Sequence, residues 1–163
     1  MKTWVKVLIV TLVVAVPTVP LGQVIWPPNP MGPQPTGGQL PLFIVLAVIE
    51  SLLLGLGVSF VAFGLPLLQR AGRSSALTWA AFVGIAWLAV SWWPHDGLHR
   101  SLDHEDLNGL LRIEYGFHVT LMIAAVVVGL FFVRTLAEKE AAESTGTQVV
   151  GPIGLDTARA EPR

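Results

Sequence analysis

The residues best suited to chemistry lie in one stretch, 92–120, of an otherwise apolar chain. This stretch contains all four histidines and five of the eleven acidic residues. Imidazole and carboxylate groups together are ligands for zinc, copper, iron and manganese. Because the chain contains no cysteine, thiolate metal sites, cysteine nucleophiles and disulfides are excluded. Any metal would be held by histidine and carboxylate side chains.

Two pairs of these residues are four positions apart, which puts both side chains of a pair on one face of a helix. Glu114 and His118 form one such pair, and His95 and His99 form the other. The second pair shares a face only if the segment 94–99, which opens with proline, is a short interfacial helix rather than a turn. The glycine in this segment leaves that choice open.

A further carboxylate, Glu50, stands alone in a long apolar segment, where a charge facing lipid is costly and a partner inside the protein is expected. An α-helix rises about 1.5 Å per residue, so Glu50, His95 and Glu114 all lie about 30 Å from the cytoplasmic ends of their own helices. His118 lies at about 24 Å on the same scale. We therefore predict a copper, zinc or iron site near the outer membrane edge with these ligands: His95, His99, His118, Glu114 and Glu50.

Other interpretations of this cluster stay open. A haem could take His95 and His118 as axial ligands, although a haem at the membrane rim is less typical than one within the span. Alternatively, Glu and His side chains could form hydrogen bonds that only fix helix packing, each worth about 0.6 kcal/mol in membrane proteins. A di-iron site is disfavoured because its Glu-x-x-His motif has a spacing of three and occurs twice.

Composition decides which class of protein must position these groups. The chain is 53% hydrophobic and only 13% charged, whereas soluble proteins average about 25% charged. The lipid bilayer is therefore the expected environment. A formal net charge of −1 and the lack of a long basic run argue against nucleic acid as a partner, because phosphate binding needs clustered Lys and Arg.

Four stretches reach the roughly 20 apolar residues that a transmembrane helix needs. The expected helices cover residues 5–26, 40–68, 75–93 and 106–140, the last with its span at 114–133. The predicted fold class is an all-α integral membrane protein, a four-transmembrane-helix bundle over residues 1–143. The remaining segment, 144–163, is too polar to order itself and is predicted to be a disordered cytoplasmic tail.

Residues near the helix ends refine these boundaries. Pro17 and Pro20 remove backbone donors and should kink the first helix or end it early. Two lysines precede its apolar run, so residues 1–15 could instead be a cleaved signal peptide, which would leave three helices. Asp103 is the expected N-cap residue of the fourth helix.

The positions of lysine and arginine predict the orientation, because cytoplasmic loops carry an excess of both. One set of helix ends is flanked by Lys2, Lys6, Arg70, Arg73, Arg134 and Lys139. The opposite loops contain only Arg100 and Arg112, which acidic residues outnumber. We expect a multi-pass protein of the plasma (inner) membrane with both termini in the cytoplasm. The histidine-rich loop 94–113 is then extracytoplasmic.

Small residues recur every fourth position on two helices, which lets helix backbones approach closely in a membrane. One stripe is Ala47, Ser51, Gly55 and Ser59, and the other is Ala76, Ala80 and Gly84. Packing inside the chain is the main interpretation of these stripes, and contact with other membrane proteins is the second.

The sequence supports metal handling, or metal-dependent chemistry on a membrane-soluble substrate, as the leading function. It does not decide whether the protein is an enzyme. One alternative is an accessory or assembly subunit of a larger membrane complex, in which the polar cluster is purely structural. A lower-ranked alternative is a proton relay through Glu50, Glu114 and His118. No ionisable residue in the cytoplasmic two-thirds of any expected span continues that path.

Overall fold

The computed structural model describes residues 1–32, 34–71, 76–103 and 105–148, and all regular elements in these ranges are helices. Their bounds are α1 Thr3–Ile25, α2 Leu40–Phe63, α3 Leu65–Ala71, α4 Ala76–Val90, α5 Trp92–Ser101, α6 Leu107–Ile113, the π-helix η1 Glu114–Val119, and α7 Thr120–Gln148. Four continuous helical stretches in the described chain are long and apolar enough to cross a membrane: Thr3–Ile25, Leu40–Phe63, Ala76–Ser101 and Leu107–Ser144. The prediction of an all-helical protein with four such helices is confirmed.

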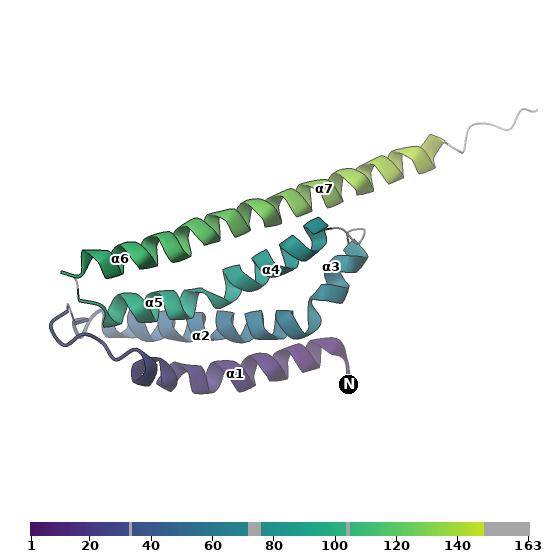
Figure 1. The fold of residues 1–163 in the computed structure, drawn as a ribbon. Helices are drawn as coiled ribbons and strands as arrows, with labels where there is room; N and C mark the ends of the chain where they lie inside the picture. Colours follow the sequence, from purple (N-terminus) through teal and green to yellow (C-terminus); the bar gives the residue numbers. More distant parts are fainter. Residues whose placement is uncertain (33, 72–75, 104, 149–163) are drawn as a thin grey trace, which may run out of the picture.

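The four long helices lie side by side in chain order (Figure 1). The α1 helix packs against α2, α2 packs against α4 and α5, and α4 packs against α7. The α1 and α7 helices therefore form the two outer edges of the row. Many large apolar side chains on the outer faces are exposed, as expected for surfaces that lipid would cover.

Small residues allow the close approach of α1 and α2. A Cβ atom on Gly55 would overlap the backbone carbonyl of Thr11, so only glycine fits there. The hydroxyls of Thr11 and Ser59 form a hydrogen bond of 2.9 Å, and Ser59 donates to the carbonyl of Val7 at 3.1 Å. The predicted stripe on α2 thus packs inside the chain along part of its length.

The α1 helix does not end at its prolines. Pro17 and Pro20 both lie inside the helix, which continues to Ile25. The prediction that they could end the helix early is therefore wrong. A proline removes only the hydrogen bond that its own missing amide would make. The helical turns before and after it can therefore continue in a membrane helix.

Two other long segments bend where the sequence analysis expected straight helices. The second helix stops at Phe63, and α3 starts again after Gly64, because Pro66 lacks the amide that would bond to the carbonyl four residues earlier. Pro94 has the same effect between α4 and α5, where the bend lies at Ser91. The bends let α3 close one end of the row and let α5 present a polar face at the other.

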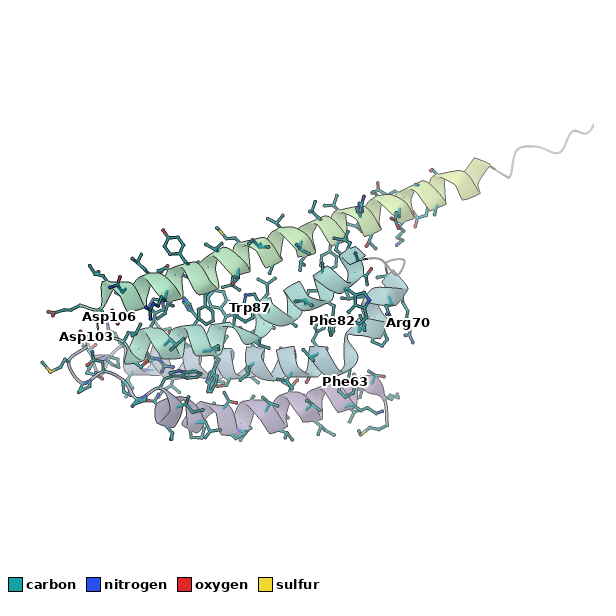
Figure 2. The ribbon with its side chains drawn as sticks, in the orientation of Figure 1. Phe63, Arg70, Phe82, Trp87, Asp103 and Asp106 are labelled. Carbon is teal, nitrogen blue, oxygen red and sulfur yellow. The ribbon has the colours of Figure 1, made fainter. Side chains whose placement is uncertain are left out.

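Charged residues gather at the two ends of the row. Figure 2 shows Arg70 at the end where α3 lies, and Asp103 and Asp106 at the opposite end. The N-cap of α6 is Asp106, whose carboxylate accepts a hydrogen bond of 2.9 Å from the amide of Gly109. Asp103, the predicted cap, instead accepts from the amide of Glu105 in the preceding turn. The predicted cap is therefore wrong by three residues.

The last helix is longer than expected. The α7 helix continues to Gln148, five residues into the segment that was predicted to be a disordered tail. The rest of that segment, residues 149–163, lies outside the described residues, and so does residue 75, the first residue of the expected third helix. Near this end of the row, Leu68, Ala81 and Phe131 form a buried apolar core.

Candidate functional site

Helix α5 positions two of the predicted ligands. The segment 94–99 is helical, so His95 and His99 lie on one face and their ring centroids are 4.6 Å apart. Gly97 is required on the opposite face, because a Cβ atom there would overlap the indole ring of Trp26. This glycine left the choice between helix and turn open in the sequence, whereas in the structure it is where the outer loop packs closely on α5.

The loop between α1 and α2 also holds the end of α5. The amide of Asn29 donates to the carbonyl of Arg100 at 3.0 Å, and the side-chain amide of Asn29 donates to the carbonyl of Leu102 at 3.3 Å. The last carbonyls of a helix have no partner within the helix. Asn29 therefore satisfies two polar groups at the helix end and fixes α5 against the loop.

The π-helix η1 positions the other pair. Nδ1 of His118 is hydrogen bonded to Oε2 of Glu114, and Oε1 of the same carboxylate lies 3.5 Å from Nε2 of His99. One carboxylate therefore links η1 to α5. The ring centroids of His118 and His95 are 4.8 Å apart. The structure thus brings together four predicted ligands, which we call the histidine cluster: His95, His99, His118 and Glu114.

The members of the histidine cluster differ in exposure. The side chains of Glu114 and His118 are 47% and 45% exposed, and His99 is 29% exposed. His95 lies deeper, and among the described residues its buried Nε2 atom has no hydrogen-bond partner. A buried nitrogen without a partner is unfavourable, so this atom is the part of the cluster that would gain most from a ligand.

The fifth predicted ligand, Glu50, does not join the histidines. Glu50 is 5% exposed and interacts with the side chain of Asp96, while its buried Oε2 atom has no hydrogen-bond partner among the described residues. Asp96 in turn forms an ion pair of 2.9 Å with Arg100. We call these three residues the acid cluster. Positions 96 and 100 are rotated by about 100° around α5 from positions 95 and 99, so this cluster faces α2 while the histidines face η1.

The acid cluster contains residues that sequence reasoning missed. Asp96 and Arg100 were read as loop charges that help to set the orientation of the chain. Their spacing of four was a usable signal, because Asp and Arg at i and i+4 pair on a helix. The rule applies only to a helix, and the sequence alone left open whether this segment is helical. The prediction that Glu50 turns inward and finds a partner agrees with its burial, although the partner is a carboxyl group.

The histidine cluster is not arranged as a metal site in its present form. Among the described residues, no three His, Asp or Glu side chains are placed to hold a metal ion. The carboxylate of Glu114 bonds to His118 and approaches His99, so it uses the atoms that would face a metal. The remaining histidine, His104, lies outside the described residues.

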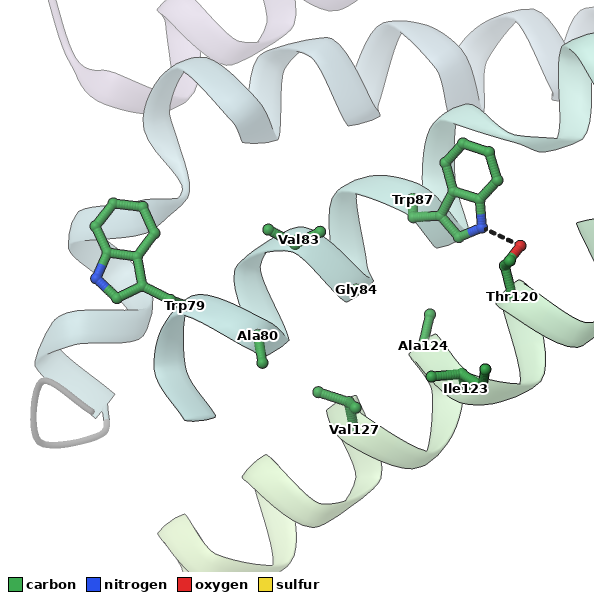
Figure 3. A pocket seen from close by; sticks show the side chains of 9 residues that line it. All are labelled: Trp79, Ala80, Val83, Gly84, Trp87, Thr120, Ile123, Ala124 and Val127. Atoms are coloured by element: carbon green, nitrogen blue, oxygen red, sulfur yellow. Dashed lines mark hydrogen bonds between the residues drawn. The ribbon is translucent and has the colours of Figure 1, made fainter. Parts of the chain in front are cut away.

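Behind the histidine cluster, an apolar cavity of about 440 Å³ lies between α4 and α7 (Figure 3). It is lined by Trp79, Ala80, Val83, Gly84, Trp87, Thr120, Ile123, Ala124 and Val127. At one end, the indole nitrogen of Trp87 donates to the hydroxyl of Thr120 at 2.9 Å. This hydrogen bond between α4 and α7 was not predicted from the sequence.

Comparison with known proteins adds no assignment to this geometry. No protein-family model, no curated protein and no solved structure matches the chain.

Proposed function

We propose that the protein binds a transition metal ion, copper, zinc or iron, at the histidine cluster. The observation that carries this proposal is the meeting of three imidazoles and one carboxylate from two separate helices. The ring centroids of His99 and His118 lie 4.6 and 4.8 Å from that of His95. Imidazole and carboxylate donors suit these metals, and intramembrane ionisable groups mark functional sites by default.

Metal binding requires the side chains of the cluster to turn. Metal bonds to imidazole nitrogen and carboxylate oxygen are about 2.0–2.2 Å long, so the donor atoms must converge on one point. Glu114 and His118 are about half exposed and are free to change rotamer. The Nε2 atom of His95 has no hydrogen bond to give up among the described residues. The cost of forming the site is therefore mainly the contact of Glu114 with the histidines.

The residues of this chain would divide the work around a bound ion. His95, His99 and His118 would hold it as neutral imidazoles, and Glu114 would ligate it or accept a proton from a bound water. A transition metal supplies Lewis acidity and lowers the pKa of such a water. We leave Glu50 out of the ligand set because its carboxyl group is buried and lies beside Asp96 on the α2 side of α5.

The site would open toward the extracytoplasmic side of the plasma membrane. Lys2, Lys6, Arg70, Arg134 and Lys139 lie near the helix ends remote from the histidine cluster, which supports cytoplasmic termini by the positive-inside rule. A site at the membrane edge could receive ions from outside and substrates from the bilayer. Metal handling and metal-dependent chemistry on a membrane-soluble substrate both fit that position.

Elemental analysis of the detergent-purified protein tests the proposal. The wild type should contain about one equivalent of a transition metal, and His118→Ala should lose most of it. Glu105→Gln, which removes an exposed carboxylate elsewhere in the outer loop, is the matched control and should retain the metal. Wild-type protein that stays free of metal, even after dialysis against Cu²⁺, Zn²⁺ and Fe²⁺ in turn, would contradict the proposal.

A second candidate function is that of an accessory subunit of a membrane complex. The observation that favours it is that Glu114 already bonds to His118 and approaches His99 without a metal, so the cluster could simply tie α5 to η1. The double variant His118→Ala, Glu50→Gln separates the two candidates. Loss of a co-purifying complex with no change in metal content would support the accessory role.

A further inference from the structure

The π-helix η1 sets the direction in which one proposed ligand points. A π-turn has hydrogen bonds between residues five apart, whereas an α-turn joins residues four apart. It therefore contains one extra residue, and each residue of an α-helix turns by about 100°. If η1 became α-helical, Glu114 and α6 would rotate by about 100° relative to α7. Whatever holds the π-turn thus holds Glu114 toward His99.

Thr120 lies where η1 meets α7 and supports the π-turn with its hydroxyl. Its backbone amide bonds to the carbonyl of Phe117, three residues back. An α-helix would instead join this amide to the carbonyl of Gly116. That carbonyl receives the Thr120 hydroxyl at 2.6 Å, and Phe117 O lies 3.0 Å from the same hydroxyl. The side chain thus bonds to a carbonyl that the π-turn has displaced.

Trp87 on α4 holds this hydroxyl from the neighbouring helix. Its indole nitrogen donates to Oγ1 of Thr120 at 2.9 Å (Figure 3). Its ring also stacks on Phe117, with ring centroids 5.8 Å apart and an interplanar angle of 11°. The ring of Phe117 meets His95 with its edge, at 5.4 Å between centroids. One tryptophan therefore fixes two residues at the π-turn and reaches the histidine cluster through one of them.

We propose that Thr120 and Trp87 form a clamp that holds η1 in its π-helical form, and that Thr120 is a positioning residue for Glu114. Thr135 on the same helix makes the same bond from its hydroxyl to the carbonyl four residues back, at 2.8 Å to Phe131, in an α-helical stretch. Thr120 differs because its hydroxyl also receives the hydrogen bond from Trp87 and lies within reach of a second carbonyl, that of Phe117. The effect of the clamp on metal binding rests on the proposed function, whereas its effect on the position of η1 does not.

Three substitutions test the clamp through metal binding. Thr120→Val keeps the shape of the side chain and removes the hydroxyl, Thr120→Ser keeps the hydroxyl, and Thr135→Val is the matched control. Zn²⁺ and Cu²⁺ are titrated into each purified protein by calorimetry. We expect Thr120→Val to weaken binding by about 10- to 100-fold, the range seen when a residue supporting a ligand is removed. Thr120→Ser and Thr135→Val should bind as the wild type does.

A distance measurement tests the clamp without any metal. The chain contains no cysteine, so Leu111→Cys on α6 and Leu56→Cys on α2, both exposed, accept a single pair of spin labels. A rotation of about 100° at the surface of a helix moves a label by up to about 8 Å. Pulsed electron paramagnetic resonance should show this displacement in Thr120→Val and not in Thr120→Ser or Thr135→Val.

Trp87→Phe keeps an aromatic ring against Phe117 and removes only the hydrogen-bond donor. It therefore tests the clamp if Thr120→Val does not fold. It should move the label distance in the same direction by a smaller amount. Unchanged label distances in both folded variants would overturn the clamp. A wild type that binds neither Zn²⁺ nor Cu²⁺ would count against the metal proposal. The distance measurement would still decide whether Thr120 holds η1.

Discussion

The two polar faces of α5 differ in a way that suggests different roles. On the α2 side, Asp96 lies between the buried carboxyl of Glu50 and the guanidinium of Arg100, so its carboxylate is paired with a base. On the η1 side, three imidazoles share one half-exposed carboxylate, and the described residues leave Nε2 of His95 without a partner. The acid cluster likewise leaves the buried Oε2 atom of Glu50 without a hydrogen-bond partner among the described residues, so the two clusters differ mainly in exposure and in the ion pair that the acid cluster contains.

The two faces of α5 show that polar residues at the same membrane depth need not form one site. Residues 95 and 96 are neighbours in sequence and lie at almost the same depth, yet they point about 100° apart around the helix. One faces a solvent-accessible edge and the other a packed interface. We therefore propose ligand binding for the histidine cluster alone and a role in helix packing for the acid cluster.

The largest expected effect separates the two clusters by metal affinity. His95→Ala should lower the affinity for the bound metal by at least about 100-fold, because removing a ligand costs more than removing a residue that supports one. Glu50→Gln should leave the affinity within a few-fold of the wild type. Competition with a chelator of known affinity measures both. An equal loss in the two variants would show that Glu50 belongs to the metal site and would remove the distinction.

The second effect concerns stability. Arg100→Met removes the guanidinium that bonds to Asp96 at 2.9 Å, and a hydrogen bond to a charged group contributes about 2 kcal/mol. We expect the free energy of unfolding to fall by about that amount, measured by denaturant titration in detergent micelles. Arg112→Met, which removes an exposed arginine from α6, is the control and should change stability little. Equal effects of the two variants would contradict the structural role of the acid cluster.

The third effect is the response of the metal to acid. A histidine binds metal only in its neutral form, so protons compete with the metal. Affinity should therefore fall as the pH is lowered, about tenfold per pH unit for each competing proton. Metal content after equilibration between pH 5 and pH 8 checks this. A flat profile would point to carboxylate ligands alone.

The sequence was sufficient to predict the four long helices of this fold, but not how each helix is rotated about its own axis. Length and hydropathy predicted four long apolar helices, and Pro66 was available as a signal for the break after Phe63. Counting residues along a helix estimates depth, because the rise per residue is nearly constant. The direction of a side chain depends on every turn between it and its neighbours. A single π-turn changes that direction by about 100°.

The same difference between depth and direction explains which contacts of the candidate site could be predicted from the sequence. The spacing of Glu114 and His118 was enough to put them together, because a separation of four brings side chains near each other on a helix. Glu50 was misplaced because its depth matches the histidines while its helix faces the other side of α5. The hydrogen bond from Trp87 to Thr120 joins positions 33 apart in sequence and has no local pattern that could reveal it.

The smallest expected effect decides whether the histidine cluster is only a structural tie. Glu114→Gln keeps a side chain of the same shape that still bonds to one histidine, and it removes the charge shared by His99 and His118. Polar pairs between membrane helices contribute about 0.6 kcal/mol, and this carboxylate is half exposed, so metal-free protein should lose no more than that amount in denaturant titration. Glu105→Gln provides the baseline. A loss as large as that of Arg100→Met would mean that the metal-free contact of Glu114 is itself a main support of α5 and η1. The histidine cluster would then resemble the acid cluster in role, and the accessory function would gain the stronger support.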